Sequence, residues 1–321
     1  MNPLDLEFRI GAEELLLAQG VLALLLVASL IGFVLSRTVK SEAGKKTVQN
    51  MNQRIAAWWA MVAVFFGAVA AGWTGTNVLF LLISFLALRE FMTLTPTRPS
   101  DHGALLWVFF VITPLQYFLV WSRWYGLFSV FIPVWAFLAI PTRLAIAGEP
   151  ERFLERAAKV QWGLMVSVFC VSHAPALLLL EIPGYEGQTP KLLFFLIAIA
   201  QLSDVFQYVF GKLFGKHKIA PVLSPNKTVE GFVGGVATVT LLGALLSPFT
   251  PFPKPIAALL ALAIALMGFA GGLVMSAIKR DRGVKDYGNL IAGHGGILDR
   301  IDSICFAAPV FFHLVRYFYT P

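Results

Sequence analysis

Apolar and polar residues alternate in long blocks along this chain. About ten apolar runs approach the roughly 20 residues that a helix needs to cross a bilayer, and short polar segments separate them. The runs cover residues 15–36, 55–73, 75–93, 104–121, 125–145, 161–181, 191–211, 229–249, 255–278 and 303–319. The pattern predicts an all-α fold, a polytopic transmembrane helical bundle that forms a single integral membrane domain over residues 1–321.

The composition excludes a water-soluble globular protein. Hydrophobic residues make up 58% of the chain and charged residues 13%, whereas a soluble domain carries about 25% charged residues. The mean hydropathy is +0.75. Both cysteines, Cys170 and Cys305, lie inside apolar runs, which favours core positions over a disulfide or a zinc site.

The distribution of positive charge predicts the orientation. The segments 37–54, 89–103, 142–160, 212–228 and 279–302 hold 20 of the 25 Lys and Arg residues. By the positive-inside rule these loops are cytoplasmic and both termini lie outside, in a bacterial inner or plasma membrane. The net charge of +7 is then explained by topology and contact with anionic membrane lipids, and no nucleic acid is expected as a partner.

The segment from Asp204 to Gly231 is the first of two loops with candidate chemistry. Lysines stand there beside glycines and a Ser-Pro-Asn-Lys-Thr unit at 224–228, a composition that suits phosphate binding. A basic loop that only fixes orientation is the alternative. Asp204 lies near the end of an apolar run, where a carboxylate is costly unless it meets a cation or pairs with a lysine.

The segment from Ser276 to Asp302 is the second loop. Asp299 and Asp302 share one face at the start of a helix, and their mutual repulsion favours a cation such as Mg²⁺ between them. A glycine-rich turn at 292–296 suits an anion. A helix cap and a salt-bridge network with Arg300 form the alternative. Together the two loops predict a metal-dependent phosphate site with cytoplasmic catalytic loops. The sequence shows no catalytic triad, and His173 and His313 are interpreted as single core histidines.

These motifs resemble a known family. The series Ser276-x-x-Lys279-Arg280, Lys285-Asp286, Gly293-His294-Gly295-Gly296 and Asp299-Arg300-x-Asp302 is similar to the C-terminal signature of phosphatidate cytidylyltransferases, the CDP-diacylglycerol synthases. The first loop is similar to another motif of that family at Asp204, Gly211, Gly215, Ser224-Pro225, Lys227-Thr228 and Glu230-Gly231. The resemblance covers residues 190–305.

The resemblance implies transfer of CMP from CTP to phosphatidic acid, giving CDP-diacylglycerol and pyrophosphate. It implies Mg²⁺, with or without a monovalent cation beside it, and a homodimer. Asp299 and Asp302 are the expected metal ligands. The expected catalytic residues are Ser276, Lys279, Lys285 and Asp286, and the expected substrate-binding residues are Asp204, Ser224, Lys227, Thr228, Arg280 and His294.

Two positions depart from the family pattern. Gly272 stands where a metal-ligating Asp is expected, and Ala292 replaces a proline. The first change leaves open a divergent or catalytically impaired relative. Such a relative would act on another lipid phosphate, or would bind phospholipid as the partner of another lipid enzyme. A transporter is disfavoured, because no internal repeat is visible.

Overall fold

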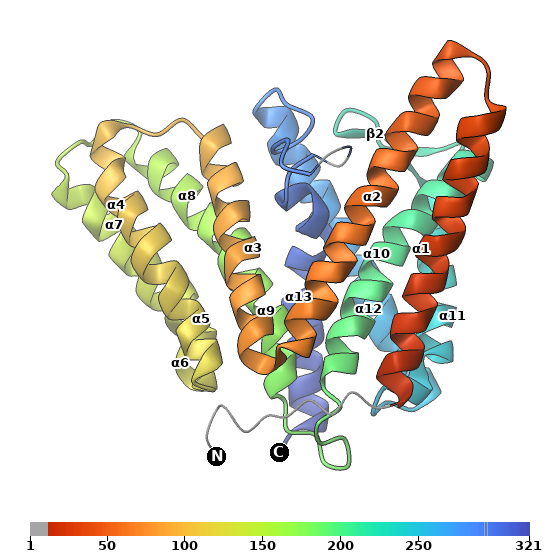
Figure 1. Ribbon diagram of the computed structural model, residues 1–321. Coiled ribbons are helices and arrows are strands. Elements are labelled where there is room, and N and C mark those ends of the chain that lie inside the picture. The colour runs from red at the N-terminus through yellow and green to blue at the C-terminus, as the bar shows by residue number, and fades with distance from the viewer. Residues whose placement is uncertain (1–11, 292, 294) are drawn as a thin grey trace.

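The structure, a computed structural model, describes residues 12–291, 293 and 295–321 and is almost entirely helical (Figure 1). The α-helices of the first half are α1 (Ala12–Thr38), α2 (Glu42–Ala70), α3 (Gly72–Leu94), α4 (His102–Trp107), α5 (Thr113–Trp121), α6 (Tyr125–Val130), α7 (Phe137–Ile146), α8 (Phe153–Leu164) and α9 (Cys170–Ala176). Those of the second half are α10 (Pro190–Phe214), α11 (Val229–Leu245), α12 (Lys254–Asp281) and α13 (Leu298–Tyr319).

Short π-helical turns join three pairs of these helices into continuous spans. They are Val108–Ile112, Phe131–Ala136 and Met165–Phe169. Among the described residues, nine helical segments are long and apolar enough to cross a membrane, and α11 is a shorter apolar helix. The chain is therefore an integral membrane protein with an all-α bundle, as its pattern of apolar runs predicts.

One pair of predicted spans meets without a loop. Helix α2 ends at Ala70 and α3 begins at Gly72, whose φ of +79° is in the left-handed region that glycine adopts without strain. Helix α2 also begins at Glu42, well before the predicted start at residue 55, so much of the expected 37–54 loop is helical.

The five basic loops lie at the same end of the bundle. Figure 1 places the α1–α2, α3–α4, α7–α8, α10–α11 and α12–α13 connections at the top, and we call this end the basic face. The opposite end carries the α5–α6 turn and the C-terminus. The prediction that these five loops lie on one side of the bundle is therefore confirmed.

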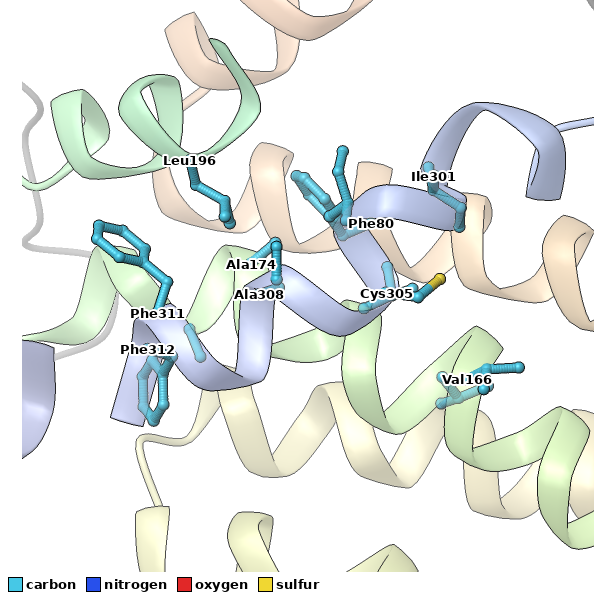
Figure 2. Close-up of a cluster of buried hydrophobic side chains, with 14 of the residues drawn as sticks. Phe80, Val166, Ala174, Leu196, Ile301, Cys305, Ala308, Phe311 and Phe312 are labelled. Atoms are coloured by element: carbon cyan, nitrogen blue, oxygen red, sulfur yellow. The ribbon is translucent and has the colours of Figure 1, made fainter. Parts of the chain in front are cut away.

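Helix α13 occupies the centre of the core. Figure 2 shows side chains of α3, α9, α10 and the Met165–Phe169 turn gathered around it, namely Phe80, Val166, Ala174 and Leu196 against Ile301, Cys305, Ala308, Phe311 and Phe312. Cys305 is fully buried and free, so its predicted core role is confirmed. This packing fixes α13, whose first turn carries Asp299 and Asp302.

The expectation of core histidines is confirmed for His173 and was wrong for His313. His173 is fully buried, whereas the His313 side chain is exposed, and their ring centroids lie 5.1 Å apart. Arg156 of α8 is buried, and its Nε donates to Asp101 Oδ1 at 2.8 Å. Asp101 belongs to the short turn Pro99–Asp101 just before α4, so this contact depends on tertiary packing.

Candidate active site

A two-stranded hairpin presents the first loop at the basic face. β1 (Lys218–Ala220) pairs antiparallel with β2 (Ser224–Thr228), so this part of the loop is not irregular. Thr228 ends β2 and caps α11, because its Oγ1 accepts from the Gly231 amide at 3.1 Å. A Cβ on Gly231 would stand 2.9 Å from the Gly211 Cα, so the glycines let α10 and α11 approach closely.

Lys227 extends from this hairpin into the interior. Its Nζ lies 4.5 Å from the centre of the Phe269 ring and interacts electrostatically with Asp204 and Asp302. Burial lowers the pKa of Lys227, against the two carboxylates, which raise it. The nearest atom to a Cβ built on Gly272 is this same Nζ, at 3.1 Å. The space beside Gly272 is therefore taken by an ammonium group.

Lys279 and Asp299 form a buried ion pair at the second loop. Lys279 Nζ donates to Asp299 Oδ1 at 2.8 Å, and the two side chains are 11% and 3% exposed. Asp299 Oδ2 accepts from the amides of Tyr287 and Gly296 at 2.7 and 3.0 Å. Both oxygens of Asp299 thus hold the loop between α12 and α13 in place.

Arg280 connects the two loops. Its Nε donates to the Leu223 carbonyl of the hairpin at 3.2 Å, and its Nη1 donates to the Val284 carbonyl at 2.9 Å. Ser276 lies one turn earlier on α12 and donates to the Gly272 carbonyl at 2.6 Å. Residues from segments more than 50 positions apart are therefore brought to one end of α12.

The remaining predicted residues lie around this centre. Lys285 and Asp286 are exposed in the α12–α13 loop, and a Cβ on Gly295 would stand 3.2 Å from that of Asp286. Ser224 begins β2, opposite Ala220. His294 and Ala292 lie outside the described residues.

Two residues far away in the sequence hold the second loop, and sequence reasoning missed both. Glu90, in α3, accepts from the Ile297 and Leu298 amides at 2.9 Å each. A Cβ on Gly288 would meet the Glu90 carboxylate at 2.9 Å. Arg54 of α2 donates from Nε to the Gly293 carbonyl at 3.0 Å. Glu90 is an isolated acid near the end of an apolar run, the same signal that drew attention to Asp204.

The carboxylates fit a divalent cation only in part. The described residues contain no group of three or more His, Cys, Asp or Glu side chains that could hold a metal ion. Mg²⁺ needs only one or two carboxylates when substrate phosphates complete its shell, and Asp204 and Asp302, which both interact electrostatically with Lys227, meet that requirement. Asp299 directs its oxygens at loop donors instead, and its assignment as a metal ligand stays a prediction.

Comparison with known proteins decides the family. The chain matches the cytidylyltransferase family over residues 52–318. It belongs to that family. This cytidylyltransferase-family chain is 42% identical over 297 residues to the uncharacterized protein YnbB of Escherichia coli K12, covering 92% of the chain and 96% of that protein.

Named enzymes match a shorter part. The phosphatidate cytidylyltransferases of Staphylococcus epidermidis and Staphylococcus aureus are each 40% identical over 157 residues. The match covers 48% of this cytidylyltransferase-family chain and 60% of each enzyme. Similarity to the named enzymes is thus confined to about half of the chain.

Proposed function

We propose that this protein transfers CMP from CTP to phosphatidic acid, giving CDP-diacylglycerol and pyrophosphate at the cytoplasmic face of the membrane. The observation that carries the proposal is the convergence of Lys227 from the hairpin with Asp204 and Asp302 from α10 and α13, beside the Lys279–Asp299 pair. Family membership and the match to named phosphatidate cytidylyltransferases support the same reaction.

Charge neutralisation is the main task of such a site. CTP and phosphatidic acid are both negatively charged and repel each other. A phosphate oxygen of phosphatidic acid must nevertheless come within bonding distance of the α-phosphorus of CTP. The partly buried ammonium of Lys227 and the Arg280 guanidinium at the loop junction supply fixed positive charge for phosphates. Ser224 and Thr228 lie on the same strand as Lys227. Lys285 adds an exposed positive charge from the α12–α13 loop.

The nucleophile needs no strong base in this reaction. A phosphate oxygen of phosphatidic acid, already ionised, forms the new bond to the α-phosphorus, and the bond to the β-phosphate oxygen breaks to release pyrophosphate. The protein contributes alignment and a position at the lipid headgroup. Asp204 and Asp302 would hold Mg²⁺, which would supply positive charge for the substrate phosphates.

The orientation rests on charge. All five loops of the basic face carry Lys or Arg, and the candidate site lies among them. The positive-inside rule then favours a cytoplasmic site with both termini outside, where CTP reaches it from the cytosol. Phosphatidic acid would arrive from the inner leaflet.

A second candidate function follows from Gly272. If the missing carboxylate has impaired the metal site, the chain is a relative that acts on another lipid phosphate, or one that binds phospholipid as a partner of another lipid enzyme. The Lys227 ammonium beside Gly272 favours this reading, because it puts a positive group where the family pattern has a negative one.

One assay separates the two functions. The purified full chain in lipid nanodiscs receives labelled CTP, phosphatidic acid and Mg²⁺, and CDP-diacylglycerol and pyrophosphate are measured together. We expect equal amounts of both products. Lys227→Met should abolish them, while Lys218→Met, an exposed lysine of the same hairpin, should leave the rate unchanged. No product from a preparation that still binds CTP overturns the proposal.

A further inference from the structure

A cavity lies at the end of the bundle opposite the basic face. Its volume is about 240 Å³, and it is open on one side and lined by the α5–α6 turn, the end of α9 and the last turn of α13. Its polar lining is Arg123, Tyr125, Glu181, Arg316 and Thr320, and the other lining residues are apolar. Neither the family nor the proposed reaction assigns a role to this cavity.

Arg123 is the first sign that the cavity takes an anion. Its Nε and Nη2 are buried, and no hydrogen-bond partner for either atom occurs in the part of the chain that the structure describes. Nη1 reaches only the exposed Glu181 carboxylate, at 4.0 Å. Buried guanidinium donors are costly without an acceptor, so an anionic group in the cavity would stabilise them.

The backbone at Arg123 is explained by the end of α5. Its φ of +60° lies in the left-handed region, and the Arg123 and Trp124 amides donate to the Val120 and Leu119 carbonyls at 3.0 and 3.1 Å, a common C-terminal cap of a helix. This cap fixes Arg123 in the α5–α6 turn at the cavity wall.

Arg316 supplies a second cation. Its guanidinium carbon lies 3.6 Å from the centre of the Tyr125 ring, which holds the planar group flat at the cavity wall. Two guanidinium groups therefore line the cavity, together with the exposed Glu181 carboxylate and Pro321 at the end of the chain. Planar guanidinium groups bind phosphate oxygens in bidentate fashion, so phosphate is the chemistry that fits best.

The apolar lining identifies the source of the phosphate. Leu119, Leu180 and Phe312 form part of the wall, and Trp124, beside the cavity, is 59% exposed at the end of the span, as residues of an aromatic belt are. A free anion gains nothing from such a wall, whereas an acyl chain does. The volume suits a headgroup rather than a whole lipid.

The cavity is separate from the candidate active site. Asp299 and Arg316 lie in the first and last turns of α13, about 25 Å apart at 1.5 Å per residue. We propose that this cavity binds the headgroup phosphate of an anionic phospholipid from the leaflet opposite the candidate active site. Such a lipid would tie α13, which carries the acidic residues, to α5, α6 and α9.

The test uses short-chain lipids and the full chain in neutral detergent. Melting curves are recorded with dihexanoyl phosphatidylglycerol, dihexanoyl phosphatidylcholine or inorganic phosphate. We expect phosphatidylglycerol to raise the melting temperature saturably, and the other two to have little effect. Arg123→Gln and Arg316→Gln should each weaken phosphatidylglycerol binding about tenfold, the loss expected for one charged hydrogen-bonding group.

Two further variants keep the test decisive if an arginine variant folds poorly. Glu181→Gln removes an exposed carboxylate beside Arg123 and should tighten phosphatidylglycerol binding. Arg37→Gln, an exposed arginine at the end of α1, is the matched control and should leave binding unchanged. Equal stabilisation by inorganic phosphate, equal stabilisation by phosphatidylcholine, or binding insensitive to both Arg123 and Glu181 overturns the proposal.

Discussion

The Lys227 ammonium lies 3.1 Å from the point where a Cβ on Gly272 would stand. Lys227 comes from the hairpin and Gly272 from α12, 45 positions apart, and outside the α12 backbone around Gly272 no other atom of the described residues lies within 4 Å of that point. Gly272 therefore lacks the expected carboxylate and also leaves room for the Lys227 ammonium of the hairpin, because it has no side chain. That cation interacts electrostatically with Asp204 and Asp302.

Restoring the expected carboxylate tests this relationship. In Gly272→Asp the new side chain would pair with Lys227 and draw its charge away from the other two carboxylates, so we expect CDP-diacylglycerol synthesis to fall about tenfold, the scale of a charged hydrogen bond. Gly272→Ala, which adds only the Cβ, should retain most of the activity. The measurement is steady-state kcat and the KM for CTP. A rate gain in Gly272→Asp would show instead that the natural site lacks a needed ligand.

Asp299 and Asp302 should respond differently to magnesium. Asp302 interacts electrostatically with Lys227, and its Oδ1 accepts from the adjacent Ser303 amide at 2.8 Å. The oxygens of Asp299 instead accept from Lys279 and from two loop amides. We expect Asp302→Asn to raise the Mg²⁺ concentration needed for half-maximal activity. Asp299→Asn should lower kcat at every Mg²⁺ concentration, because the loop loses its support. If Asp299→Asn is rescued by excess Mg²⁺, Asp299 is a direct metal ligand.

Glu90 is expected to act as a positioning residue. Its carboxylate accepts from two successive amides at the start of α13, and a Gln in its place offers only one oxygen. Glu90→Gln should lower kcat by about tenfold or more with little change in the KM for CTP.

Hydrogen exchange provides the second readout for Glu90. In Glu90→Gln, exchange should rise at residues 288–298 and stay unchanged in the hairpin at 218–228. Glu42→Gln, an exposed acid on α2, is the control. A purely global destabilisation would raise exchange in both segments and would contradict the positioning role.

Much of the fold could be read from the sequence because apolar runs of spanning length allow few structures other than helices. The grouping of the five basic loops at one end of the bundle could be read from the distribution of Lys and Arg. The contacts that hold the site were harder to foresee. Glu90 is 207 positions from Ile297, and its role depends on how α3 packs beside α13, which no local pattern encodes. The neighbourhood of Lys227 and Gly272 likewise arises only when the hairpin folds over α12.

The buried ion pair between Arg156 and Asp101 should make a large contribution to stability. Their side chains are 4% and 2% exposed. Arg156→Met leaves the Asp101 charge buried without its partner, and we expect a loss of about 3–5 kcal/mol. The double variant Asp101→Leu/Arg156→Met removes both charges and should recover part of that loss. Thermal unfolding in detergent measures each step, and equal losses in single and double variants would contradict the coupling.

Glu149 should make stability depend on acid pH. Hydrogen bonds that Ser100 and Arg98 donate hold the pKa of Glu149 below its usual value. The unfolded chain therefore takes up the proton first, near pH 4.3, and the folded chain only at lower pH, so the stabilisation is complete above that range and is lost as pH falls through the folded pKa. Glu149→Gln should melt at a lower temperature than the parent at pH 7, and the gap should close below about pH 4. Glu42→Gln, which removes an exposed surface pair, should show a smaller gap at pH 7. A gap for Glu149→Gln that stays constant from pH 7 to pH 3.5 would show that the carboxylate charge contributes nothing there.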